Sequence, residues 1–241
     1  MKLDLWMCLM NVNNKSRVKT ASSTRITTNP VLDSIFTELG YTEGSKASLI
    51  YLEVHLRSIG LVPESINRTH LSELVKLLMD EGVNLHPLKA DLALVSIPND
   101  SVPYPVLTAR GYARLYKQKQ GKLLVKPMYY GDHFANNDLS TCVTPENIII
   151  DSKREIEGFI AVYKENDSDL TLSSSISTDE INDILNRFHK CSLPASQIGT
   201  GLAFNRLFKV NRTFKMNPST VKFNEWFNQA RAQIKTTYRK H

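Results

Sequence analysis

Apolar residues recur every three or four positions through the first part of the chain, a spacing that predicts helices. The positions that carry this spacing are Leu49, Leu52, Leu56, Ile59, Leu71, Leu74, Val75 and Leu78. They predict one or two helices over residues 30–60, with Gly60 just after the last turn. Another helix is expected to start near Thr69, a good N-cap residue, and to stop at Gly82. Residues 1–28 are polar and weakly periodic, and we interpret them as a flexible arm.

From residue 84 onward the pattern changes to short apolar runs that are typical of strands. The β candidates are residues 92–98, 103–109, 122–134, 145–151, 155–164 and 169–176. An Asn, Asp and Ser cluster at residues 166–169 separates the last two runs, which favours a hairpin there.

Two short helices are expected among these strands. The first covers residues 110–121 and is closed by Gly121. The second begins after Ser177, which forms a capping box with Glu180. Residues 190–220 show no clear period and are left without a predicted element.

The final helix, expected from about Asn224 to the C-terminus, combines an apolar stripe with a cationic one. The apolar stripe consists of Trp226, Ala230, Ile234 and Tyr238. The cationic stripe consists of Arg231, Lys235 and Arg239, one position further on and therefore about 100° around the axis. Like charges four residues apart repel each other by a few tenths of a kcal/mol. The cationic stripe could contact a phosphate backbone. Equally well, the apolar stripe could pack on the protein while the flanking cations extend their charged ends into water.

Composition sets the broad class of the protein. Of 241 residues, 41% are hydrophobic and 22% are charged, which excludes a collagen-like, low-complexity or wholly disordered chain. No apolar run approaches the roughly 20 residues of a membrane helix, and the N-terminus does not have the pattern of a signal peptide. Three widely spaced cysteines offer neither a disulfide framework nor a metal knuckle. We therefore expect a soluble, reduced, intracellular protein.

Positive charge is segregated along the chain. The formal net charge is +6, but residues 110–126 alone carry +6 and residues 187–241 carry +10, with Glu225 as their single acid. The remainder of the chain consequently sums to −10. Two such cationic segments indicate a polyanionic partner, and nucleic acid is the leading class.

Four segments, in order, resemble the RecT/Redβ family of phage single-strand DNA annealing proteins. They are LHPLKADLALVSIP (85–98), the stretch from PYPVLTARGYARLY to the G-D-x-F ending (103–134), EIEGFIAVYK with the following hairpin (155–181), and the closing NEWF helix with its K-T-x-x-R core (224–241). Together they cover roughly residues 84–189 and 222–240. The segment between Phe188 and Trp226 is longer than the family pattern.

The resemblance implies an α+β fold in which an antiparallel β-meander or hairpin sheet is backed by helices, similar to the Rad52 annealing core. It divides the chain into an arm (1–28) and a single annealing domain (29–241), whose helical part (29–83) precedes the RecT-like core and C-terminal helix (84–241). It also implies an ATP-independent recombinase that is not an enzyme. Such a protein binds single-stranded DNA, assembles as a homo-oligomeric ring or helical filament, and yields annealed duplex.

The same resemblance implies the surroundings of the protein. No cofactor is expected, and Mg²⁺ is considered only as an aid to DNA binding. The expected partners besides DNA are a phage 5′–3′ exonuclease and the host single-strand-binding protein. The expected location is on DNA in the cytoplasm of a bacterial host, with no membrane involved.

Annealing requires a strand to be held by its phosphates with its base edges free, so Lys and Arg are the expected contacts. The candidate DNA-binding residues are Arg110, Arg114, Lys122, Lys126, Arg231, Lys235, Arg239 and Lys240. Lys122 and Lys126 are four apart and should share one face of a strand. The cations of the final helix are expected to close the same trough from the opposite side. No catalytic or metal-binding residue is assigned.

Two other functions fit a basic α+β protein of this size. A metal-dependent nuclease needs clustered carboxylates around Mg²⁺. Glu155 and Glu157 lie near Asp132 in the order of segments, but no E-x-K motif follows them and no D-x-D motif precedes them. A sequence-specific DNA-binding regulator needs a recognition helix, and the acidic helix that starts near Thr69 suits that role poorly.

Overall fold

The computed structural model describes residues 28–42, 46–116, 121–130, 133–134, 142–143, 155–165, 171–210 and 217–238. The arm expected at residues 1–28 lies outside these residues apart from Thr28, and so does the β candidate at 145–151. In α7 the side chains beyond Ile234 are also outside the description.

The first third of the chain is helical, as expected. Its elements are α1 (Pro30–Glu38), α2 (Lys46–Ser58), the short 3-10 helix η3 (Pro63–Ser65) and α3 (Arg68–Asp80). Gly60 and Gly82 follow α2 and α3 with φ of +81° and +59°, in the left-handed region that favours glycine. The start of α3 differs from the prediction, because Asn67 rather than Thr69 caps it by accepting the Thr69 N–H at 2.9 Å.

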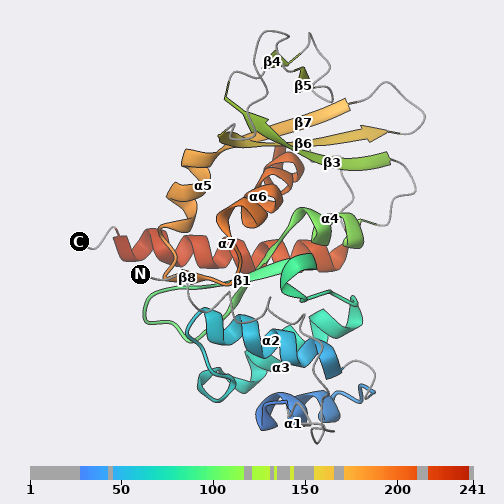
Figure 1. The fold of residues 1–241 in the computed structure, drawn as a ribbon. Helices are drawn as coiled ribbons and strands as arrows, with labels where there is room; N and C mark the ends of the chain where they lie inside the picture. Colours follow the sequence, from blue (N-terminus) through green and yellow to red (C-terminus); the bar gives the residue numbers. More distant parts are fainter. Residues whose placement is uncertain are drawn as a thin grey trace, which may run out of the picture.

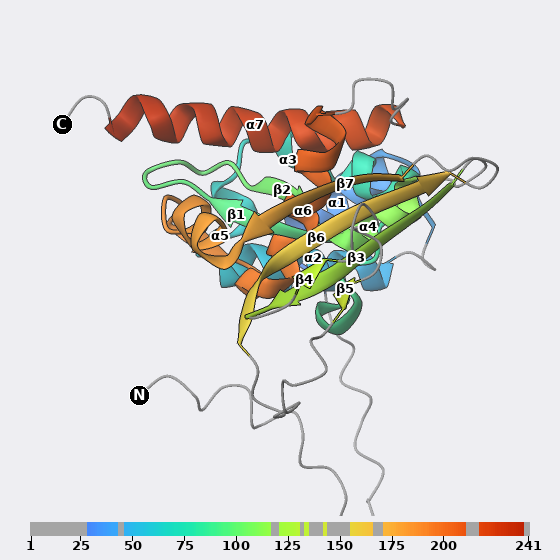
Figure 2. The same ribbon diagram turned by 90° about the horizontal axis from the view of Figure 1, so that it is seen from above.

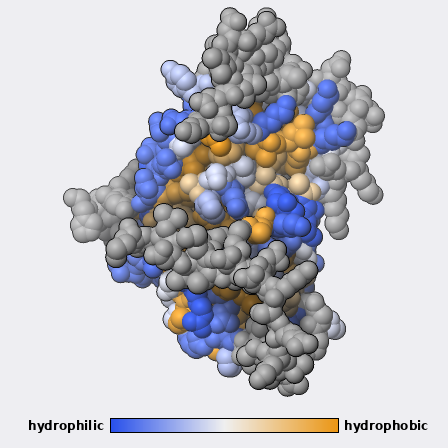
Figure 3. Space-filling model, in the orientation of Figure 1, coloured by the Kyte–Doolittle hydropathy of each residue, from blue (hydrophilic) through white to orange (hydrophobic). Residues whose placement is uncertain are grey.

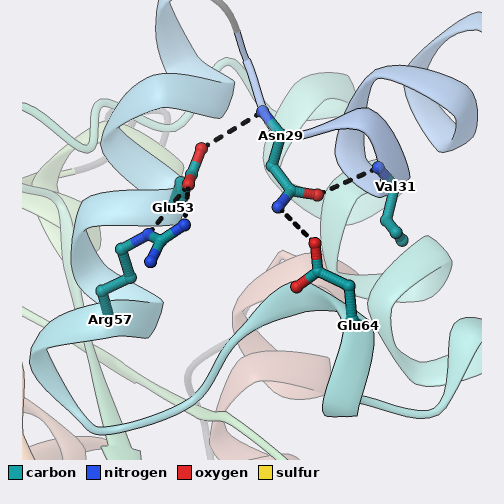
Figure 4. Close-up of polar contacts among 5 residues, drawn as sticks. All are labelled: Asn29, Val31, Glu53, Arg57 and Glu64. Atoms are coloured by element: carbon teal, nitrogen blue, oxygen red, sulfur yellow. Dashed lines mark hydrogen bonds and ion pairs between the residues drawn. The ribbon is translucent and has the colours of Figure 1, made fainter.

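A polar junction at Asn29 holds these helices together (Figure 4). The Asn29 Oδ1 atom caps α1 by accepting the Val31 N–H at 2.9 Å, while its Nδ2 donates to Glu64 at 2.7 Å. The Asn29 backbone N–H donates to Glu53 at 3.2 Å, and Glu53 also accepts from Arg57. One residue thus ties the start of α1 to η3 through its side chain and to α2 through its backbone N–H.

The strands form two three-stranded antiparallel sheets and one short pair. The first sheet has the order β2-β1-β8 and contains β1 (Leu92–Ser96), β2 (Tyr104–Leu107) and β8 (Lys190–Cys191). The second has the order β3-β6-β7 and contains β3 (Gly121–Tyr129), β6 (Ile156–Glu165) and β7 (Thr171–Ser177). β4 (His133–Phe134) pairs with β5 (Cys142–Val143). The expected β6–β7 hairpin pairing is confirmed. Gly121 is not a helix stop, since it begins β3.

The remaining elements are helices α4 (Ala109–Leu115), α5 (Thr178–Leu185), α6 (Ala195–Val210) and α7 (Pro218–Tyr238), with the 3-10 turn η4 (Pro87–Lys89) before β1. Ser177 caps α5 as predicted, accepting the Glu180 N–H at 3.2 Å. Helix α6 lies in the stretch without a predicted element, and α7 starts six residues earlier than expected.

These elements stack in layers, and the α+β class is confirmed (Figures 1 and 2). The β3-β6-β7 sheet lies at one end, α4, α5 and α6 lie beneath it, and α7 and the β2-β1-β8 sheet come next, followed by α2, α3 and finally α1. One apolar core runs through all the layers, from Leu32 to Ile234. Figure 3 shows apolar side chains reaching the surface on one face below the β3-β6-β7 sheet, with hydrophilic side chains around them.

A buried hydrogen-bond chain joins the N-terminal helices to the first sheet. His55 Nε2 donates to the Leu85 carbonyl at 2.9 Å, so in the neutral ring Nδ1 accepts from the Ser192 hydroxyl at 2.8 Å. The Ser192 Oγ atom in turn accepts the Leu94 N–H at 2.7 Å. The His55 ring is 2% exposed, and burial lowers its pKa, with the Leu85 bond opposing that shift.

Candidate nucleic-acid interface

The outer face of the β3-β6-β7 sheet carries a group of lysines. Side chains alternate along β3, so Leu123 points into the core while Lys122, Leu124 and Lys126 share the opposite face. The prediction that Lys122 and Lys126 face the same side is therefore confirmed. Lys126 is half-buried and Lys122 is exposed.

The register of β3 with β6 brings a third lysine to this face. Lys122 lies directly opposite Lys164, and both are exposed. Like charges at directly opposed positions destabilise a sheet, so their pairing is unfavourable unless an anion lies between them. Within the part of the chain that the structure describes, neither lysine forms an ion pair or side-chain hydrogen bond.

Apolar and hydroxyl side chains complete the outer face. Ile160 and Val162 of β6 occupy its centre and are buried. On β7, the neighbouring edge strand, the paired positions on this face are Thr171, Ser173, Ser175 and Ser177. No Asp or Glu occupies a paired position of the three strands on this face. We call this surface, defined by Lys122, Lys126, Lys164 and the β7 hydroxyls, the lysine face.

Arg110 lies at the start of α4, beside the inner face of the same sheet and therefore on the opposite side from the lysine face. Thr108 caps this helix, and its hydroxyl accepts the Gly111 N–H at 3.3 Å. Gly111 is required because a Cβ atom there would lie 2.0 Å from the Asp91 carbonyl oxygen. Arg110 is exposed, forms no ion pair with another described residue, and lines a groove of about 440 Å³ together with Pro127, the neighbour of Lys126.

A buried polar network fixes α4 to the helices beneath it. The Tyr112 hydroxyl donates to Asn224 of α7 at 2.6 Å and accepts from Asn205 of α6 at 3.3 Å. The Tyr112 ring is 2% exposed and belongs to the core. Burial raises the pKa of Tyr112. Arg110 is thus presented by a helix with a rigid support.

Arg114, on the same helix, has a different environment. Its Nε atom lies 2.5 Å from Oδ2 of Asp91, a carboxylate that is 2% exposed and that also accepts the Asn84 N–H at 2.8 Å. Removing Arg114 would take the ion pair away from the buried Asp91 carboxylate. The geometry therefore gives Arg114 a structural role in holding α4 against the start of β1.

The C-terminal cations lie elsewhere on the molecule. Arg231 lines a small pocket between α5 and α7 with Arg187, and its guanidinium is 5.9 Å from the centre of the Phe227 ring. Burial and the neighbouring Arg187 lower the pKa of Arg231, although arginine stays charged. Lys235 is in α7 but its side chain is outside the described residues, as are Arg239 and Lys240.

Among the side chains that the structure describes, the cations from the middle and the end of the chain do not form the single trough that was expected. Helix α4 contacts α7 at Asn224, whereas Arg231 is about 10 Å and Lys235 about 16 Å further along the helix axis. In Figure 1, α4 and the C-terminal half of α7 accordingly lie on opposite sides of the molecule. Arg110 and Arg231 line separate pockets. The described residues therefore form two cationic regions.

Lys164 and Arg187 were not among the site residues predicted from the sequence. Lys164 ends an alternating strand, and its partner Lys122 is 42 positions earlier, so only the register reveals the pair. Arg187 could have been found from its position one turn after the apolar stripe of α5. Asp132 lies outside the described residues, and nothing is described of the His133 side chain.

The described residues contain no group of three or more His, Cys, Asp or Glu side chains placed to hold a metal ion. Among the described helices, none combines the length and apolar character needed to cross a bilayer. In comparisons with known proteins, no family model matches the chain, and no curated protein matches it.

Proposed function

We propose that this protein binds single-stranded DNA through the sugar–phosphate backbone, assembles into homo-oligomers and promotes pairing of complementary strands without ATP. The lysine face is the observation that carries this proposal. It offers cations and hydroxyls, the groups that contact phosphates, on either side of its buried apolar centre, with no acid at its paired positions.

The opposed pair of Lys122 and Lys164 supports an anionic ligand specifically. Adjacent strands are about 4.8 Å apart, so two ammonium groups at opposed positions can approach one phosphate from both sides. Phosphate contacts of this kind carry no sequence information, and they leave base edges free for a second strand. Both properties are what annealing of arbitrary sequences demands.

The order of segments that resembles the RecT/Redβ family supports the same function, and the α+β class agrees with it. The second cationic region, around Arg187 and Arg231, lines a pocket of its own between α5 and α7. In an oligomer, this region would contact DNA that leaves the lysine face of a neighbouring copy. The proposed setting is DNA in a bacterial cytoplasm, with a phage exonuclease and the host single-strand-binding protein as candidate partners.

The test is a strand-annealing reaction with two complementary oligonucleotides that carry a fluorophore and a quencher. The wild-type protein should accelerate quenching equally with and without ATP, and Lys122→Ala/Lys164→Ala should lose most of the acceleration. A matched control is Lys76→Ala/Lys190→Ala, which removes two exposed lysines that form no ion pair with described residues. Equal rates for the two double variants would remove the lysine face from the proposal.

The same reaction separates the two other functions. Shortened oligonucleotides on a denaturing gel in the presence of Mg²⁺ would establish a nuclease in place of an annealing protein. Binding that is confined to one duplex sequence would establish a regulator.

A further inference from the structure

The groove beside Arg110 has features that phosphate binding alone does not explain. It lies between the start of α4, the first turn of α6, η4 and the ends of β3 and β6, and its volume is about 440 Å³. This is within the range of roughly 300–1,000 Å³ that is typical of small-molecule sites. Leu88, Pro127, Ile156 and Phe159 supply its apolar lining, and Arg110 and Gln197 are polar groups at its wall.

Two of these apolar side chains are unusually exposed. Leu88 is 67% exposed and Ile156 is 39% exposed, and both line the same groove although Leu88 lies in η4 and Ile156 begins β6. Water-exposed aliphatic side chains that meet in a concave site next to a cation mark a place for a ligand with an apolar face and a negative charge.

The position of the groove relative to the lysine face narrows the class of that ligand. β3 is the edge strand of its sheet, Lys126 points to the outer face, and the adjacent Pro127 lines the groove. A chain of phosphates that lies on the lysine face therefore reaches the groove by passing over one strand edge. A nucleotide of that chain has both required parts, since its base has two apolar faces and its phosphate is anionic.

We propose that the groove holds one unpaired nucleotide of the bound strand, with its base against Leu88 and Ile156 and its phosphate at Arg110. The Gln197 amide, which can both donate and accept, lies where it can meet the polar edge of any base. This inference rests on the proposed function and adds to it a contact with the base itself. In annealing, such a site would hold one base apart from its neighbours while the others remain free to pair.

The test compares a poly-thymidine oligonucleotide with an oligonucleotide of equal length in which every base is absent. Both present the same phosphates, so their affinities differ only through contacts to the bases. The wild-type protein should bind the abasic probe about tenfold more weakly, which corresponds to about 1.4 kcal/mol and lies within the range of base-stacking contributions. Leu88→Ser/Ile156→Ser should lose affinity for poly-thymidine alone, so that the two probes bind nearly equally.

Two further variants keep the result interpretable. Val54→Ser/Val62→Ser replaces two other exposed apolar side chains, 49% and 41% exposed, on the N-terminal helical layer, and should preserve the tenfold difference. Arg110→Ala should weaken the binding of both probes to a similar extent. An undiminished difference in Leu88→Ser/Ile156→Ser would overturn the nucleotide groove, as would equal affinities in the wild type, while the proposed function would stand. Failure of the wild type to bind either probe would overturn both.

Discussion

Lys122 of β3 and Lys164 of β6 occupy directly opposed positions of an antiparallel sheet, on the face that points away from the core. Cross-strand pairs contribute roughly 0.2–1 kcal/mol, and the contribution is unfavourable for like charges. Replacing both lysines with alanine should therefore leave the free energy of unfolding unchanged or raise it slightly, while DNA binding weakens. This combination would show that Lys122 and Lys164 serve DNA binding and not the stability of the fold.

The salt dependence of DNA binding provides a quantitative form of this prediction. Each phosphate contact to a single strand contributes about −0.7 to the slope of log affinity against log salt concentration. Lys122→Ala/Lys164→Ala should flatten that slope by about 1.4, as measured by fluorescence anisotropy at several salt concentrations. Lys76→Ala/Lys190→Ala should retain the wild-type slope, and an unchanged slope in the first variant would contradict phosphate contact by these lysines.

Arg110 and Arg114 are on one short helix and should give opposite results when replaced by alanine. Arg114→Ala removes a charged hydrogen bond to the buried Asp91 carboxylate and should lower the free energy of unfolding by about 1.5–3 kcal/mol. Arg110→Ala should change stability by less than about 0.5 kcal/mol and should weaken DNA binding more. Urea unfolding and anisotropy on both variants check this, and the reverse pattern would exchange the two roles.

Protein stability should fall as the pH drops below neutrality because of His55. Its pKa is lowered in the folded state, so between that pKa and the unfolded value near 6.5 the unfolded chain binds more protons, and stability rises with pH. One group contributes at most about 1.4 kcal/mol per pH unit. The measurement is urea unfolding of the wild type and of His55→Gln between pH 7.5 and 5.

The glutamine variant should be less stable than the wild type at pH 7.5, because it disturbs the bonds to Ser192 and Leu85. Its stability should nevertheless depend less on pH over the same interval. Parallel pH profiles for the two proteins would show that another group is responsible.

Asn29→Ala should destabilise the protein by about 1 kcal/mol, since it removes the cap of α1 and the bond to Glu64. Asn29→Asp keeps the capping oxygen but places a second carboxylate beside Glu64. It should therefore lose stability at pH 7 and recover part of it when the carboxylates are protonated. Thermal unfolding at pH 7 and at an acidic pH where the carboxylates are protonated distinguishes this charge effect from loss of the cap.

The local elements were largely predictable, because caps and alternation are local properties. The hairpin of β6 and β7, the cap at Ser177 and the glycines after α2 and α3 all follow from short-range chemistry. Helix α6 was missed for the opposite reason. Most residues of α6 are themselves buried, so the helix has no apolar stripe with a polar face opposite to it. Its glycines also resemble helix breakers. Gly201 is there because a Cβ atom would lie 1.7 Å from the Leu107 carbonyl oxygen of β2.

The candidate site was less predictable, because it depends on contacts between distant segments. The stripe of α7 shows the difference. Phe223, Phe227, Ala230 and Ile234 are buried, whereas Trp226 is only partly so, because the neighbours of the helix decide which of its apolar residues face inward. The start of α7 did have a local signal, since Asn217 accepts the Ser219 N–H at 2.9 Å immediately before Pro218. That the cations form two regions follows from tertiary packing alone.

The bond between His55 and Ser192 spans 137 positions of the chain. During synthesis on the ribosome, the N-terminal helices emerge long before the hydroxyl that completes their polar interior. A nascent chain that stops before residue 190 therefore contains the His55 imidazole without the hydroxyl that donates to it, and β1 without its β8 partner. The helical layer can reach its final packing only after residue 192 has been translated.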